Sequence, residues 1–142
     1  MELIMSKEVK HFYTWEEFDR DIGVMAAWAR RRSFAKIYGI PRGGLVLAVA
    51  LSYHLNLPFV SEIDQIDSQT LIADDMVDTG ATALKLEAAL GFRPVLAVLF
   101  SNDASKRPAD FAIQKKIQWV VFPWETEVTS RYDGTFTIKT ES

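Results

Sequence analysis

The sequence predicts one α/β domain, spanning residues 1–142, with a parallel sheet flanked by helices. Apolar segments with strand character alternate along the chain with segments of helical periodicity, and Gly-containing turns separate several of them. No internal repeat or linker-like stretch interrupts this order. Strands that alternate with helices form parallel sheets with crossover connections, and ligands bind beyond the carboxyl ends of such strands. We therefore expect the functional residues at those ends.

The first helix has the clearest start. Thr14 and Glu17 have the spacing of a capping box, and apolar residues then recur at helical intervals up to the basic residues 30–32. Further helices are predicted over 45–55 and over 82–90, the second one ended by a glycine. Strands are predicted from apolar or alternating runs over 34–38, 58–60, 70–73, 93–100, 119–122 and 135–139.

Composition excludes several classes of function. Lys and Arg number 16 against 19 Asp and Glu, a formal net charge of -3, which disfavours sequence-independent binding to nucleic acid. The absence of Cys removes thiolate zinc sites, Cys nucleophiles and redox motifs. The sequence contains neither a membrane-spanning apolar run nor a signal peptide. We therefore expect a cytoplasmic protein that binds neither membranes nor nucleic acid.

An acidic segment follows the apolar residues 70–73. Asp74, Asp75 and Asp78 place three carboxylates within five residues, directly before a predicted helix. Carboxylates crowded in this way repel one another unless they are solvated, bound to a cation or hydrogen-bonded to ligand hydroxyls. The segment therefore indicates a site for hydroxyl groups or a metal. The structural alternative is a strand end followed by an ordinary helix cap.

The turn that comes next has the composition of an anion-binding site. Thr79 and Thr82 supply hydroxyl groups, and Ala81 adds a backbone N–H at the start of the helix. Gly80 can adopt a positive φ and admit a ligand close to the backbone. Carboxylates followed by such a turn suit a sugar phosphate, because the acids can bind its hydroxyls or a metal while the turn binds its phosphate.

A second glycine-rich turn, residues 39–44, follows the predicted strand 34–38. Arg42 can hold a diphosphate through two parallel N–H bonds, and glycines such as Gly43 let backbone N–H groups approach it. An exposed arginine in an ordinary turn is the structural alternative.

These segments resemble the type I phosphoribosyltransferases. Residues 71–82 resemble that family's phosphoribosyl pyrophosphate motif: an apolar strand, two acids, two variable residues, Asp-Thr-Gly, one variable residue and Thr. The turn 39–44 is similar to the family's pyrophosphate loop. Residues 119–125 resemble the base-binding segment of bacterial xanthine-guanine phosphoribosyltransferases.

The resemblance implies a phosphoribosyltransferase fold with a small C-terminal hood. It implies transfer of ribose 5-phosphate from phosphoribosyl pyrophosphate to a purine base, with a 6-oxopurine favoured, dependent on Mg²⁺ and releasing diphosphate. It also implies a homo-oligomer, either a dimer or a tetramer. The alternative is a regulatory protein that binds phosphoribosyl pyrophosphate or a nucleotide with little or no turnover.

Roles toward phosphoribosyl pyrophosphate follow from the same resemblance. Arg42, with Gly43, is expected to bind the leaving diphosphate and neutralise its charge. Asp74 and Asp75 are expected to hold the ribose hydroxyls together with the metal. The turn 79–82 is expected to bind the 5-phosphate.

The base is expected to meet a different set of residues. Asp78 would accept or share the purine N7 proton, Trp119 would stack on the base, and backbone groups near Val120 would read its edge. An aromatic residue in a strand is, alternatively, part of the core. The 6-oxopurine enzymes carry a Lys after the preceding apolar strand. Here Asn102 replaces it as a possible base contact, unless Lys106 reaches back.

The chain departs from the family in a second place. Family members usually carry a long loop that closes over the reacting sugar, whereas only the nine residues 61–69 lie between two predicted strands here. Nine residues make little more than a hairpin loop. We therefore expect no lid, slow transfer and some hydrolysis of the sugar donor by water.

Overall fold

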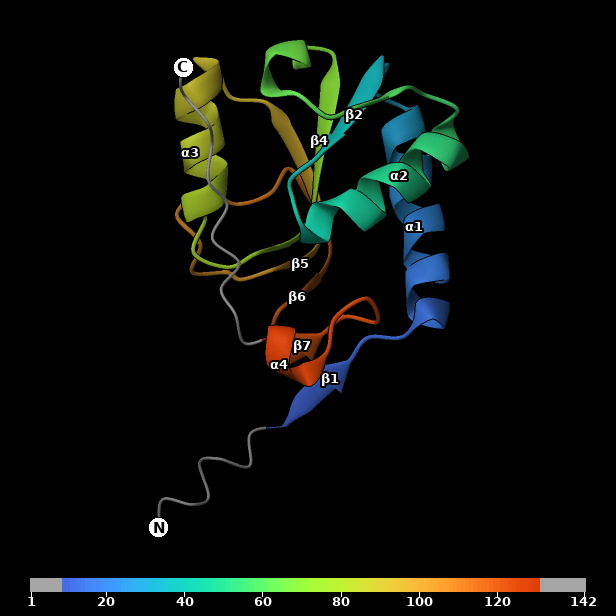
Figure 1. Cartoon of the computed structure of the whole chain (residues 1–142), viewed down its shortest axis with the longest axis vertical. Helices are drawn as coiled ribbons and strands as arrows, with labels where there is room; N and C mark the ends of the chain where they lie inside the picture. The colour runs from blue at the N-terminus through green and yellow to red at the C-terminus, as the bar shows by residue number, and fades with distance from the viewer. Residues whose placement is uncertain (1–8, 131–142) are drawn as a thin grey trace.

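The central sheet has five parallel strands in the order β3-β2-β4-β5-β6 (Figure 1). The computed structural model describes residues 9–130. The strands of this sheet are β2 (Lys36–Gly39), β3 (Phe59–Val60), β4 (Thr70–Val77), β5 (Val95–Ser101) and β6 (Phe111–Lys115). The parallel order confirms the predicted fold class and brings the carboxyl ends of the strands to one edge.

Helices cover both faces of the sheet. They are α1 (Trp15–Arg30) and α2 (Gly43–Leu55) on one face and α3 (Ala81–Leu90) on the other (Figure 1). Leu71 of β4 packs in the core that contains α1 and α2, and its neighbour Ile72 packs in the core that contains α3. Both side chains are fully buried, as expected for a central strand of a parallel sheet.

The predicted start of α1 and the predicted end of α3 are confirmed, whereas α2 begins at Gly43 and α3 at Ala81, slightly before their predicted starts. The N–H of Glu17 donates to the Thr14 hydroxyl oxygen at 3.0 Å, and the Thr14 N–H donates to the Glu17 carboxylate at 2.9 Å, so the capping box forms. The helix α3 ends at Gly91, whose φ is 81°. Within residues 9–130, no helix has the length and apolar character needed to cross a bilayer.

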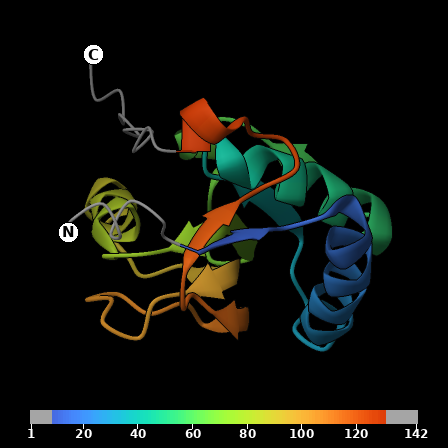
Figure 2. The ribbon, with the colours of Figure 1, turned by 90° about the horizontal axis from the view of Figure 1, so that it is seen from below.

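A second, two-stranded sheet forms the hood beyond the carboxyl ends of the main strands. It pairs β1 (Lys10–Phe12) with β7 (Trp119–Val121) in parallel, and the short α4 (Glu127–Ser130) follows (Figure 2). The hood contains the predicted C-terminal segment, and its first strand is added from the N-terminal side of α1. The strand predicted over 135–139 lies outside the described residues.

Two strand predictions need correction. The strand β4 does not end before the acids, because its pairing with β5 continues through Val77↔Ser101. Asp74 and Asp75 therefore lie on the strand itself. The strand β6 was not predicted. It lies at the edge of the sheet, and its residues are partly buried or exposed, so its sequence lacks a strong apolar signal.

The connection 61–69 is not a hairpin loop. Since β2 lies between β3 and β4 in the sheet, the connection crosses over it and contains a short 3₁₀ turn at Ile63–Gln65. Hairpin loops join antiparallel neighbours, whereas these two strands both run parallel to β2.

Candidate functional site

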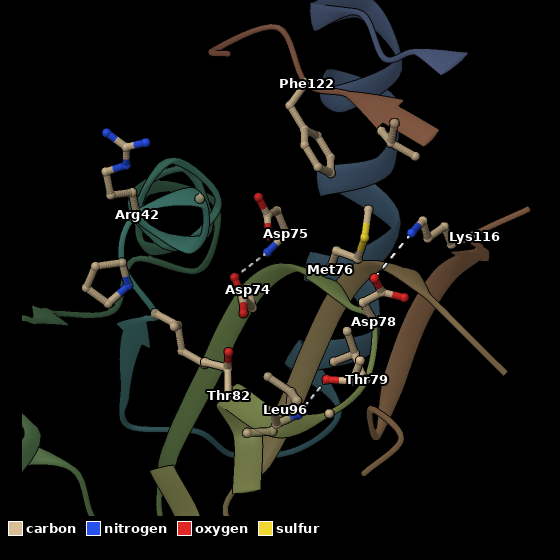
Figure 3. A pocket seen from close by; sticks show the side chains of 18 of the residues that line it. Arg42, Asp74, Asp75, Met76, Asp78, Thr79, Thr82, Leu96, Lys116 and Phe122 are labelled. Carbon is tan, nitrogen blue, oxygen red and sulfur yellow. Dashed lines mark hydrogen bonds and ion pairs between the residues drawn. The ribbon is translucent and has the colours of Figure 1, made fainter. Parts of the chain in front are cut away.

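A cavity of about 570 Å³ lies between the carboxyl end of β4, the starts of α2 and α3, and the hood (Figure 3). All the residues that the sequence predicts for the site line this cavity, with the exception of Asn102 and its alternative Lys106. Segments as far apart as the turn 39–44 and the strand β7 therefore contribute to one site.

The start of α2 packs closely on the acidic strand. A Cβ atom on Gly43 would collide with the Asp75 carboxylate, and one on Gly44 would lie 2.5 Å from the Ala73 carbonyl oxygen. Only glycine leaves room for this approach. The cis peptide bond Pro41–Arg42 immediately precedes the helix, and the exposed Arg42 side chain extends away from the acids (Figure 3).

Two adjacent carboxylates occupy the middle of the cavity. The N–H of Asp75 donates to the Asp74 carboxylate at 2.8 Å. Burial raises the pKa of Asp74 well above its usual range, and the neighbouring Asp75 charge adds to this shift; burial also raises the pKa of Asp75. Burial is the largest cause of both shifts, and a bound cation would oppose it by favouring the charged carboxylates.

The turn before α3 is shaped by Gly80. Its φ is 91°, and a Cβ atom there would lie 2.6 Å from the backbone nitrogen of Arg107. The Thr79 hydroxyl oxygen accepts from the Ala81 N–H at 3.1 Å, and the Thr79 carbonyl accepts from the Lys106 N–H at 2.9 Å. The turn is thus fixed from both sides and presents the N-terminus of α3 to the cavity.

Asp78 is held by two donors. The Asn102 amide donates to one carboxylate oxygen at 2.8 Å, and the Lys116 ammonium lies 3.3 Å from the other. The hydrogen bond from Asn102 and the Lys116 charge hold the pKa of Asp78 below its usual range. Asp78 is therefore ionised at neutral pH, and Asn102 contacts this side chain while not lining the cavity.

Sequence reasoning did not find Lys116. It follows β6 directly, and its N–H donates to the Ser101 carbonyl at 2.8 Å, which places it beside the end of β5. Lys116 therefore reaches Asp78 from β6, the strand next to the one that Asn102 follows. The sequence could not place Lys116 at the site because the strand that precedes it, β6, was not predicted.

The hood supplies the aromatic wall. The Lys116 ammonium lies 5.7 Å from the centroid of the Trp119 ring, and Val120 is buried next to it. Phe122, which sequence reasoning did not select, points into the cavity (Figure 3) and stacks on Trp124 with centroids 4.9 Å apart. Glu125 also lines the cavity; burial raises its pKa, although its carboxylate accepts from the Phe122 N–H.

Comparison with known proteins identifies the family, although no protein-family model matches the sequence. A xanthine-guanine phosphoribosyltransferase of Nitratidesulfovibrio vulgaris (strain DP4) is 30% identical over 139 residues, covering 81% of this chain and 84% of the relative. The chain belongs to the xanthine-guanine phosphoribosyltransferase family. A second member, from Gluconobacter oxydans (strain 621H), is 27% identical over 140 residues, covering 80% and 83% of the two chains.

Solved structures agree with membership in this family. A purine phosphoribosyltransferase from Pyrococcus horikoshii superposes with a TM-score of 0.71 at 26% identity, covering 82% of this chain and 94% of that one. The Helicobacter pylori xanthine-guanine-hypoxanthine phosphoribosyltransferase has the same fold, with a TM-score of 0.76 at 22% identity and coverage of 87% and 97%. The resemblance stated from the sequence is confirmed.

The connection 61–69 lies apart from the cavity of this phosphoribosyltransferase. None of its residues lines that cavity. Residues 61–64 and Ile66 instead line a second cavity against the end of α3. The prediction that the site lacks a lid from this segment stays a prediction.

Proposed function

We propose that this phosphoribosyltransferase transfers ribose 5-phosphate from phosphoribosyl pyrophosphate to a 6-oxopurine and releases diphosphate. The observation that carries the proposal is one cavity that joins two helix N-termini, an acidic strand end and an aromatic wall. The names of the relatives specify xanthine and guanine as bases, and phosphoribosyltransferases are enzymes. These names do not favour the regulatory alternative.

The two helix starts suit the two anionic ends of the sugar donor. The N-terminus of a helix attracts phosphate through its free N–H groups and its dipole. We assign the 5-phosphate to the turn 79–82 and the diphosphate to Arg42 and Gly43. Asp74 and Asp75 lie between these two positions and can accept hydrogen bonds from the ribose hydroxyls.

The acidic pair fits a bound Mg²⁺. Among residues 9–130, no group of three or more potential protein ligands could enclose a metal by itself. Mg²⁺ is commonly held by one or two carboxylates together with substrate phosphates and water. Asp74 and Asp75 supply such a pair, and when bound, the ion would neutralise charge on the leaving diphosphate.

The reaction breaks the bond between carbon 1 of the ribose and the diphosphate oxygen, which keeps both electrons. A bond forms between that carbon and nitrogen 9 of the base, which loses its imidazole proton. Arg42 stabilises the leaving group. Because the pKa of Asp78 is lowered, its carboxylate first accepts a hydrogen bond from N7–H and takes that proton only as the new bond to nitrogen 9 forms.

The test combines the purified protein, phosphoribosyl pyrophosphate and Mg²⁺ with guanine, xanthine, hypoxanthine or adenine. We expect equal amounts of diphosphate and nucleotide from a 6-oxopurine, and none when the metal is chelated. The double variant Asp74→Asn, Asp75→Asn should be inactive. Asp64→Asn, at an exposed acid outside the cavity, should retain activity. Absence of diphosphate release with all four bases would contradict the proposal.

A further inference from the structure

A second cavity lies on the face of the main sheet that α3 covers. Its volume is about 700 Å³, and it is bounded by the end of β2, the segment 61–66 and the end of α3. Two helices, α1 and α2, cover the other face of the sheet, whereas on this face α3 is the one described helix (Figure 1). The space beside α3 is therefore covered by the segment 61–66 in place of a second helix.

The segment 61–66 is held in place by the sheet. The Lys36 ammonium, on β2, donates to the Gln65 carbonyl at 2.6 Å and lies 3.1 Å from the Asp67 carboxylate. The Glu62 N–H donates to the Gln65 side chain at 3.1 Å, which closes the 3₁₀ turn. The second cavity is therefore formed before any ligand binds, as is usual for sites that take small molecules.

A buried hydroxyl group faces this cavity without a protein partner. Tyr38 lines the cavity and is only 3% exposed, and its hydroxyl makes no hydrogen bond to a described residue. The hydroxyl of the other buried tyrosine, Tyr13, donates to Asp21 at 2.6 Å. Burial and the charges of Glu62 and Asp74 raise the pKa of Tyr38, so its hydroxyl stays protonated at neutral pH. Since buried polar groups normally have a partner, a ligand is expected to supply one.

The other walls of the cavity determine which ligand fits. Among the described lining residues the charged ones are all acidic, and they belong to the segment 61–64. Most of the remaining lining is apolar: Ile63, Ile66, Ala89, Leu90 and Phe92. This lining repels an anion, and a purely apolar molecule leaves the Tyr38 hydroxyl without a partner. An ammonium ion on an apolar body donates to that hydroxyl, is attracted by the acids and buries its apolar part.

We propose that the second cavity binds an organic ammonium ion whose apolar part packs against the end of α3. The ammonium group donates to the Tyr38 hydroxyl oxygen and lies near the Glu62 carboxylate. Pro41 is the one described residue that lines both cavities, so this site is distinct from the site of transfer. The inference goes beyond the proposed function and does not depend on it.

The test titrates the full chain with benzylammonium and follows its backbone amide signals by two-dimensional NMR. Benzyl alcohol and benzoate are the neutral and anionic comparisons. We expect benzylammonium to shift the signals of Leu90 and Phe92 and to bind more tightly than benzyl alcohol, whereas benzoate should not bind there. Tyr38→Phe should weaken binding about 10-fold, as for loss of a hydrogen bond from a charged donor. Glu62→Gln should weaken it about 2- to 5-fold.

Two controls locate the bound probe. Tyr53→Phe, at a tyrosine of α2 that is 82% exposed, should leave the affinity unchanged. Because the acidic pair of the first cavity also attracts cations, the double variant Asp74→Asn, Asp75→Asn is the second control and should retain binding at Leu90 and Phe92. If Tyr38→Phe does not fold, the loss of affinity in Glu62→Gln, at an exposed side chain, decides the question.

Three results would overturn the inference. They are an unchanged affinity in both Tyr38→Phe and Glu62→Gln, loss of binding in the acidic-pair variant alone, and benzoate binding as tightly as benzylammonium. Retained binding in the acidic-pair variant together with a loss in Tyr38→Phe supports it. None of these measurements involves diphosphate release, so this inference and the proposed function can each fail without the other.

Discussion

The two sides of the cavity are built in different ways. The phosphate side, residues 42–43 and 79–82, consists of two strand-turn-helix segments whose backbone is fixed by close packing at Gly43 and Gly80. The base side, residues 116–122, receives its position from pairing with β1 and from side chains such as Phe122. We therefore expect recognition on the phosphate side to depend on backbone shape together with the Arg42 side chain, and recognition on the base side to depend mainly on side chains.

Asp78 lies where the two sides meet, so its replacement should have the largest effect. Asp78→Asn keeps the size of the side chain but cannot accept the base proton, and we expect kcat to fall about 10²- to 10⁴-fold. Binding of phosphoribosyl pyrophosphate should change little. Steady-state kinetics and calorimetry measure the two effects. Asp103→Asn, at an exposed acid, is the control. An unchanged kcat would exclude the role given to Asp78.

The phosphate side should not tolerate a Cβ atom. Gly80→Ala meets a positive φ, which costs about 1–2 kcal/mol, and a clash with Arg107, which adds about 1–3 kcal/mol. The free energy of unfolding, measured with denaturant, and the affinity for ribose 5-phosphate should both fall.

Two other glycines serve as controls for that substitution. Gly91→Ala has the positive φ but open space around it, so it should show the conformational cost alone. Gly23→Ala, within α1 and also in open space, should stabilise the protein by about 0.5–1 kcal/mol. If Gly80→Ala lowers the free energy of unfolding no more than Gly91→Ala does, the tight packing at Gly80 does not contribute to stability.

The base side should respond to loss of an aromatic side chain. Trp119→Ala should weaken nucleotide binding by about 1–3 kcal/mol, the usual contribution of stacking on one base. Trp15→Ala, at the first residue of α1, which contacts Trp124 and does not line the cavity, should leave it unchanged. Isothermal titration measures both, and equal losses would assign the effect to hood stability.

The smallest effect concerns the charge of Asp78. The pKa of this carboxyl is lowered in the folded protein, so its contribution to stability is present above the ordinary pKa and is lost as the pH falls through the lowered value. Asn102→Ala removes the first cause and should raise the pKa toward its usual range. NMR titration of the carboxyl carbons measures this, with Asp67 as an internal reference that should not move.

The difference between the two sides also explains what could be predicted. Residues 74–82 come from a strand, a turn and a helix that follow one another in the sequence. The sequence alone therefore indicated this part of the site. Lys116 reaches the site because β6 pairs with β5, and no local pattern encodes that pairing. The same holds for β1, a three-residue strand whose partner β7 lies near the other end of the described sequence.

The central claim is that the two sides bind different parts of the reactants, and a crossed titration tests it most directly. Phosphoribosyl pyrophosphate carries a diphosphate and no base, whereas guanosine 5′-monophosphate carries a base and no diphosphate. With Mg²⁺ present, Arg42→Ala should weaken only the first ligand and Trp119→Ala only the second. Equal losses of both ligands in either variant would contradict the claim.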